Sequence, residues 1–104
     1  MIKVSVLYPS TAGSRFDHDY YRDKHMPMVQ SKMGESCLRY EIDKGISGDA
    51  QGSQPRYVAM CHIFCDSLES FQGGFGPHAL DIQHDVSNYT DLMPLMQISE
   101  VIVG

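Results

Sequence analysis

The sequence predicts an α+β fold of the ferredoxin-like kind, in which a four-stranded antiparallel sheet carries two helices on one face. Three observations lead to this prediction. Residues 2–8, 37–45, 57–65 and 95–103 show the alternation or the short apolar runs of strands. Two segments with helix-start signals and amphipathic spacing separate them, which gives the order β-α-β-β-α-β. A length of 104 residues leaves room for one core, so we treat residues 1–104 as a single domain.

The first helix is expected to begin after Asp17, a favourable N-cap residue. Phe16 and Tyr21 flank this start with the spacing of a hydrophobic staple. At about 100° per residue, the inward face carries two histidines and three further side chains: His18, Tyr21, His25, Met28 and Val29. Pro27 lacks a backbone N–H and leaves the carbonyl of Asp23 without its donor, so we expect a kink beside His25.

The segment Tyr57–Cys65 is apolar on both of its sides, which predicts a central strand covered on both faces. The two helices cover one face only. Burying each exposed apolar side chain on the other face is worth roughly 1.5–3 kcal/mol. We therefore expect a homodimer in which two sheets pack face to face as a dimeric α+β barrel.

The second helical segment is expected to begin at Asp66, because Asp66 and Glu69 resemble a capping box. Leu68, Phe71 and Phe75 then form its apolar stripe. Gly76-Pro77 interrupts the helix, and a short helix restarts from His78.

Composition excludes several classes of partner. A net charge of −5 and only eight unclustered Lys and Arg residues argue against a nucleic-acid surface. No stretch approaches the ~20 apolar residues of a membrane span, and the N-terminus lacks the features of a signal peptide. Three cysteines cannot all pair, so a reducing compartment and buried thiols are expected. We expect a cytoplasmic protein that has no membrane partner.

His25 is the main catalytic candidate. It lies on the inward face at the proline break, where a freed carbonyl can hold one ring nitrogen and leave the other aimed into a pocket. This arrangement suits a general acid or base near neutral pH. The alternative is a buried histidine that only satisfies backbone carbonyls at the kink.

Four further residues are candidates for binding a substrate. Tyr21, one turn before His25, either packs in the core or donates a hydrogen bond to a ligand. His62 on the doubly apolar strand either bonds a neighbour or lines the barrel. His18 shares the inward helix face, and Met60 offers a flexible thioether to an apolar ligand or fills a gap in the core.

We expect no metal site, because the His18–His25 spacing is about 10.5 Å and no short ligand motif occurs.

The segment Phe16–Val29, with a tyrosine pair followed by His-Met-Pro, resembles the EthD family, small dimeric α+β barrel proteins linked to ethyl tert-butyl ether degradation. The resemblance continues at Asp66–Phe71, Gly76–Ala79, Asn88–Asp91 and Gln97–Val101. It implies a dimeric barrel with a cavity between sheet and helices, and an association with oxidoreductase systems. Its wider superfamily includes cofactorless monooxygenases, isomerases and cyclases, and some haem-binding barrels, although nothing in this sequence marks a haem site and no cofactor is expected.

Two functions remain open from the sequence. The first is a homodimer that binds a small apolar organic molecule and catalyses proton transfer or cofactorless oxygen chemistry, with His25 as acid or base. The second is a non-catalytic binding or accessory protein for a partner oxidoreductase, because no strong nucleophile–base or metal constellation is present.

Overall fold

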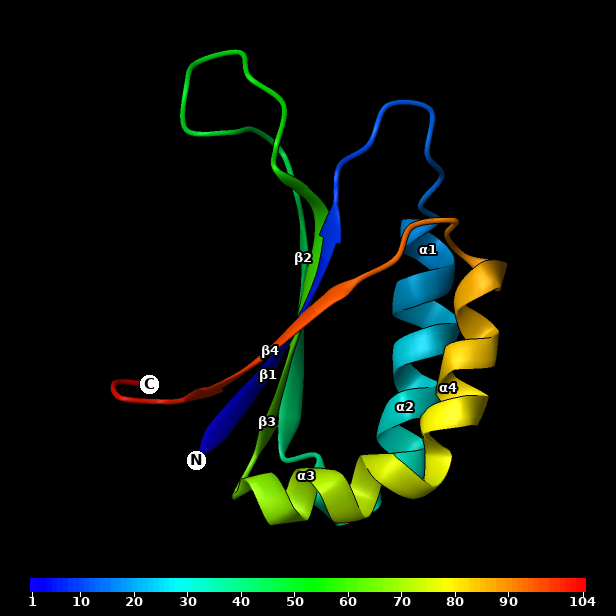
Figure 1. Ribbon diagram of the computed structural model, residues 1–104, viewed down its shortest axis with the longest axis vertical. Coiled ribbons are helices and arrows are strands. Elements are labelled where there is room, and N and C mark those ends of the chain that lie inside the picture. Colours follow the sequence, from blue (N-terminus) through cyan, green and yellow to red (C-terminus); the bar gives the residue numbers. More distant parts are fainter.

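The computed structural model describes residues 1–104, and it has the predicted ferredoxin-like α+β fold (Figure 1). Its four strands form one antiparallel sheet in the order β2-β3-β1-β4. The strands are β1 (Ile2–Pro9), β2 (Arg39–Lys44), β3 (Tyr57–Cys65) and β4 (Leu95–Glu100). The central position predicted for β3 is confirmed, since it pairs with both β1 and β2.

The helices lie on one side of the sheet (Figure 1). The first helical rod consists of α1 (His18–Tyr20), a π-helical turn (Tyr21–His25) and α2 (Met26–Met33). The second segment consists of α3 (Leu68–Phe75) and α4 (Ala79–Asp85), joined by a 3₁₀ turn. In Figure 1, α3 runs across one end of the fold and α4 turns to run alongside the first rod. No helix combines the length and apolar content that crossing a membrane requires.

The start of the first helical segment agrees with prediction, and a π turn that was not predicted lies within it. Asp17 is the N-cap as expected, and its carboxylate accepts the Tyr20 N–H at 3.0 Å. Beside His25, where a kink was expected, the structure has a widened π turn that ends just before Met26-Pro27, and in it the Met26 N–H bonds to the Tyr21 carbonyl. A π turn carries one extra residue, which accommodates the proline ring without ending the helix.

The N-cap of α3 is Ser67 and not Asp66. The Ser67 hydroxyl accepts the Ser70 N–H at 3.1 Å, while its backbone stays extended. Serine caps as well as aspartate does, so the N-cap lies one residue later than predicted and the helix begins at Leu68. This start leaves Phe71 facing the core, where it is buried.

The two faces of the sheet have different chemistry. Because paired side chains share a face and successive ones alternate, the helix side carries Val4, Tyr8, Ala59, Cys61 and Ile63, all of them buried. The open face carries a mixture of apolar, polar and charged side chains, including Leu7, Met60, His62, Phe64, Arg39, Glu41 and Asp43. The core therefore lies between the sheet and the helices.

The chain after β4 also differs from prediction. The last strand was expected to continue to Val103, but it ends at Glu100. Beyond it, the Val101 N–H bonds to the Met1 carbonyl at 3.0 Å, and the side chains of Ile102 and Val103 are exposed.

Candidate functional site

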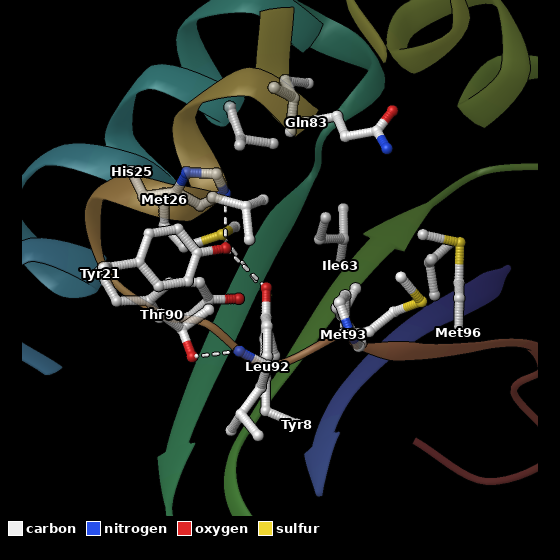
Figure 2. Close-up of a pocket in the computed structure, with 18 of the residues that line it drawn as sticks. Tyr8, Tyr21, His25, Met26, Ile63, Gln83, Thr90, Leu92, Met93 and Met96 are labelled. Carbon is white, nitrogen blue, oxygen red and sulfur yellow. Dashed lines mark hydrogen bonds between the residues drawn. The ribbon is translucent and has the colours of Figure 1, made fainter. Parts of the chain in front are cut away.

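A largely apolar pocket lies between the helix side of the sheet and the helical layer. It has a volume of about 630 Å³ and 23 lining residues, of which 17 are hydrophobic. This volume is in the range of small-molecule sites. Side chains from β1, β3, β4, both helical segments and the loop before β4 converge on it, as Figure 2 shows for Tyr8, Tyr21, His25, Ile63 and Met96.

His25 is the last residue of the π turn and is 3% exposed. Its ring stacks on that of Tyr21, with centroids 5.3 Å apart and planes 13° from parallel. Its Nδ1 lies 2.8 Å from Oδ2 of Asp85, the last residue of α4. The imidazole is thus held by a carboxylate from the second helical segment, and the backbone carbonyl that we expected to hold it plays no such part.

The second ring nitrogen of His25 faces two tyrosine hydroxyls in succession. Its Nε2 lies 3.4 Å from Oη of Tyr89, and that oxygen lies 2.6 Å from Oη of Tyr8. Figure 2 shows this path running from the helix across the pocket wall to β1. Tyr8 and Tyr89 are 2% and 0% exposed. We call the series Asp85, His25, Tyr89 and Tyr8 the relay.

Burial and hydrogen bonding set the ionisation of the relay. Burial lowers the pKa of His25, and the hydrogen bond and charge of Asp85 offset this only in part. The pKa of Asp85 is also lowered: burial by itself would raise it, but hydrogen bonds from His25 and two other neighbours outweigh burial. Burial raises the pKa of both Tyr8 and Tyr89. At neutral pH the relay therefore holds a carboxylate, a neutral imidazole and two intact phenols.

The Asp85 end of the relay reaches the surface. The Asp85 side chain is 21% exposed. Its Oδ1 accepts hydrogen bonds from the Tyr20 hydroxyl at 2.7 Å and from Asn88 Nδ2 at 2.9 Å. The carboxylate is thus fixed in direction and close to solvent, while the Tyr8 end lies in the apolar pocket.

Of the predicted site residues, His25 and Tyr21 line the pocket. His62 and Met60 belong to the open face of the sheet, where His62 Nδ1 bonds to Ser5 Oγ at 2.8 Å and Nε2 lies 3.4 Å from Asp43. His18 packs against the Phe16 ring, with centroids 4.7 Å apart, outside the pocket. The structure therefore does not bring these three together with His25.

Three relay residues were not identified from the sequence. Tyr8 was expected only as part of a strand, and Tyr89 and Asp85 had no assigned role. The signal available was weak: Asp85 and Tyr89 follow the apolar positions Ile82 and Val86 by three residues each, a spacing that puts them on the inward side of a helix. No group of three or more His, Cys, Asp or Glu side chains is placed to hold a metal ion.

Comparison with known proteins gives a family. The model of the EthD domain matches residues 12–93. A crystal structure of an EthD-like protein from Ralstonia eutropha JMP134 shares 51% identity, with a TM-score of 0.95 over 98% of this chain and 92% of that one. No curated protein gives a significant match.

Two more distant structures share the fold. An ethyl tert-butyl ether degradation (EthD) family protein from Bacillus halodurans C-125 has 19% identity and a TM-score of 0.71, over 96% of this chain and 97% of that one. A protein from Deinococcus radiodurans, provisionally assigned as an antibiotic biosynthesis monooxygenase, has 13% identity and a TM-score of 0.63, over 100% and 95%. From the match over residues 12–93 and the 51% identity, the chain belongs to the EthD family.

Proposed function

We propose that this protein binds a small, mostly apolar organic molecule in the pocket and moves a proton between that molecule and His25. The observation that carries the proposal is the relay, which joins a partly exposed carboxylate to the apolar pocket through 2.8, 3.4 and 2.6 Å contacts. A pocket lined by 17 hydrophobic residues out of 23 favours an apolar ligand.

Each relay member has a distinct task in this mechanism. The Asp85 carboxylate accepts a hydrogen bond from the Nδ1–H of His25. This bond orients the ring and leaves Nε2 as the basic nitrogen. When His25 takes a proton, the adjacent carboxylate stabilises the imidazolium, as in other His–Asp pairs. Tyr89 and Tyr8 transmit the proton from the pocket, and the electron pair stays on the ligand.

The same step can begin oxygen chemistry without a cofactor. A deprotonated, electron-rich ligand gives up electrons to molecular oxygen more readily than its neutral form. The fold shared with the provisionally assigned monooxygenase supports this extension of the proposal. The proposed proton transfer between the ligand and His25 does not depend on this oxygen chemistry.

The proposal is tested by His25→Ala in the intact protein. We expect the variant to fold and to lose proton-transfer activity by about 10²–10⁴-fold, the usual contribution of a general acid or base. His84→Ala is the matched control, since His84 is exposed on α4 and outside the pocket. A folded His25→Ala protein with ligand affinity and turnover equal to the parent would show that His25 has no such role.

A second candidate is a non-catalytic binding protein that carries an apolar intermediate to a partner oxidoreductase. The hydrogen bonding of the protein favours this candidate, because no buried polar side-chain atom lacks a partner. Such a pocket can bind a ligand without reacting. Turnover of a metabolite mixture by the purified protein alone would remove this candidate.

We further propose a cytoplasmic homodimer formed through the open face of the sheet. Leu7, Met60 and Phe64 on that face are apolar, and the Arg39 guanidinium lies 3.8 Å above the Phe64 ring. In a face-to-face dimer His62 and Met60 would meet a second copy. Under this arrangement they contribute to the interface and not to the ligand pocket.

A further inference from the structure

The hydrogens of the relay all point in one direction. The Asp85 carboxylate only accepts hydrogen bonds, so Nδ1 of His25 carries the ring hydrogen. In the neutral imidazole, Nε2 is then an acceptor. With Nε2 accepting from Tyr89 across 3.4 Å, the single hydroxyl hydrogen of Tyr89 is used there, and we assign Tyr8 as the donor in its 2.6 Å contact with Tyr89.

This order leaves the pocket end of the relay without a hydrogen to donate. Tyr8 has committed its only hydrogen to Tyr89 at 2.6 Å, accepts a hydrogen bond from Tyr21, and offers its remaining lone pair to the pocket. A carbonyl or an ether oxygen placed there would meet another acceptor. A hydroxyl group would donate to Tyr8 and complete the series.

We propose that the ligand is an apolar molecule with one weakly acidic hydroxyl group, a phenol or an enol, which donates its hydrogen to Tyr8 Oη. This inference rests on the proposed function and names its substrate class. The proton balance is complete: the ligand O–H bond breaks, its proton goes to Tyr8, the Tyr8 proton goes to Tyr89, and the Tyr89 proton goes to Nε2. The electron pair remains on the ligand oxygen, and His25 becomes an imidazolium paired with Asp85.

Protonation of His25 reverses the series. An imidazolium donates from Nε2 to Tyr89, Tyr89 donates to Tyr8, and Tyr8 then donates into the pocket, where it favours a carbonyl. The groups that set this protonation are Asp85 from α4, Tyr89 from the following loop and the stacked Tyr21. The strands contribute Tyr8 and Cys61 behind these rings, both uncharged at neutral pH. The Lys24 ammonium lies over the Tyr20 ring, 5.8 Å from its centroid.

Three probes with one ring system test the proposal: 2-naphthol, 2-methoxynaphthalene and 2-acetylnaphthalene. Their dissociation constants are measured calorimetrically at pH 7.5 with the whole chain. We expect 2-naphthol to bind at least about tenfold more tightly than either acceptor-only probe, because an unpaired buried acceptor is costly. Tyr8→Phe should abolish the preference, because it weakens the binding of 2-naphthol and relieves the penalty on the two acceptor-only probes. Tyr57→Phe, outside the pocket, should behave as the parent.

The outcomes separate this inference from the proposed function. Equal binding of the three probes, or tighter binding of the ketone at pH 7.5, overturns the hydroxyl class and leaves the apolar pocket standing. Failure of all three to bind removes the pocket function as well. If Tyr8→Phe does not fold, the pH series on the unaltered protein decides: the naphthol-to-ketone preference should fall as His25 becomes protonated, and a constant preference contradicts the reversal.

Discussion

The imidazole of His25 and the carboxylate of Asp85 face each other at 2.8 Å although sixty residues separate them in the chain. The π turn places His25, and the C-terminal end of α4 places Asp85. Each group changes what the other can do. Asp85 fixes which nitrogen of His25 is basic, and His25 helps to keep Asp85 ionised.

The stability of the protein should fall as the pH is lowered from neutral through the titration range of histidine. Burial lowers the folded-state pKa of His25 below its ordinary value of 6.5. The unfolded chain therefore binds the proton first, and acidification favours unfolding. Burial lowers the pKa of His18 as well, so it adds to the slope in the same direction. Urea unfolding at a series of pH values between 7.5 and 4.5 measures the trend.

The contribution of His25 to this slope is isolated by His25→Gln, with His84→Gln as the control on the exposed side of α4. The dependence of the free energy of unfolding on pH should become weaker in His25→Gln. It should be unchanged in His84→Gln. A separate loss is expected at more acid pH, because the lowered pKa of Asp85 contributes stability that disappears as the pH falls through its folded value. An unchanged slope in His25→Gln would contradict the burial of a neutral imidazole.

The two tyrosine hydroxyls should be energetically coupled. Tyr89→Phe leaves Nε2 of buried His25 and the Tyr8 hydroxyl without their partner, and we expect a loss of about 1–3 kcal/mol in the free energy of unfolding. A double-mutant cycle with Tyr8→Phe should give a coupling energy of roughly 1 kcal/mol. Additive effects within about 0.3 kcal/mol would show that the 2.6 Å contact contributes nothing.

Two adjacent glycines of α3 should respond oppositely to alanine. A Cβ at Gly73 meets nothing within 4 Å, so Gly73→Ala should stabilise the protein by up to about 1 kcal/mol through helix propensity. A Cβ at Gly74 would lie 1.8 Å from Oγ of Ser36 and 2.6 Å from its Cβ. Overpacking of this kind costs about 1–3 kcal/mol, which exceeds the gain in propensity.

Thermal unfolding of the two variants measures the difference, and each serves as the other's control. Gly74→Ala combined with Ser36→Gly should recover stability, because the clashing side chain is gone. Equal melting temperatures for Gly73→Ala and Gly74→Ala would mean that α3 does not pack against the turn that holds Ser36.

The proposed dimer should be sensitive to charge on the open face of the sheet. Met60 is partly buried there, and a lysine at this position would have to be desolvated in a sheet-to-sheet interface. We expect Met60→Lys to raise the dimer dissociation constant at least about tenfold, measured by sedimentation equilibrium. Leu80→Lys, at a 69% exposed position on α4, is the control. A parent chain that is monomeric at all concentrations would refute the dimer.

The sequence alone determined the order of elements, the central place of β3 and the inward direction of Tyr21 and His25. These features depend on alternation and helical spacing, which are properties of neighbouring residues. The same kind of information placed the first helix cap at Asp17 correctly. At the second helix two adjacent residues could serve as caps, and the sequence did not distinguish Ser67, the observed cap, from Asp66.

The tertiary structure decided what His25 does. The sequence offers thirteen acidic residues as partners for it, and nothing local distinguishes Asp85 from the others. It also gave no reason to separate His25 from His62 and Met60, because a strand that is apolar on both sides does not reveal which side faces the helices. Those choices depend on contacts between segments distant in the chain, which form only when the helices pack on the sheet.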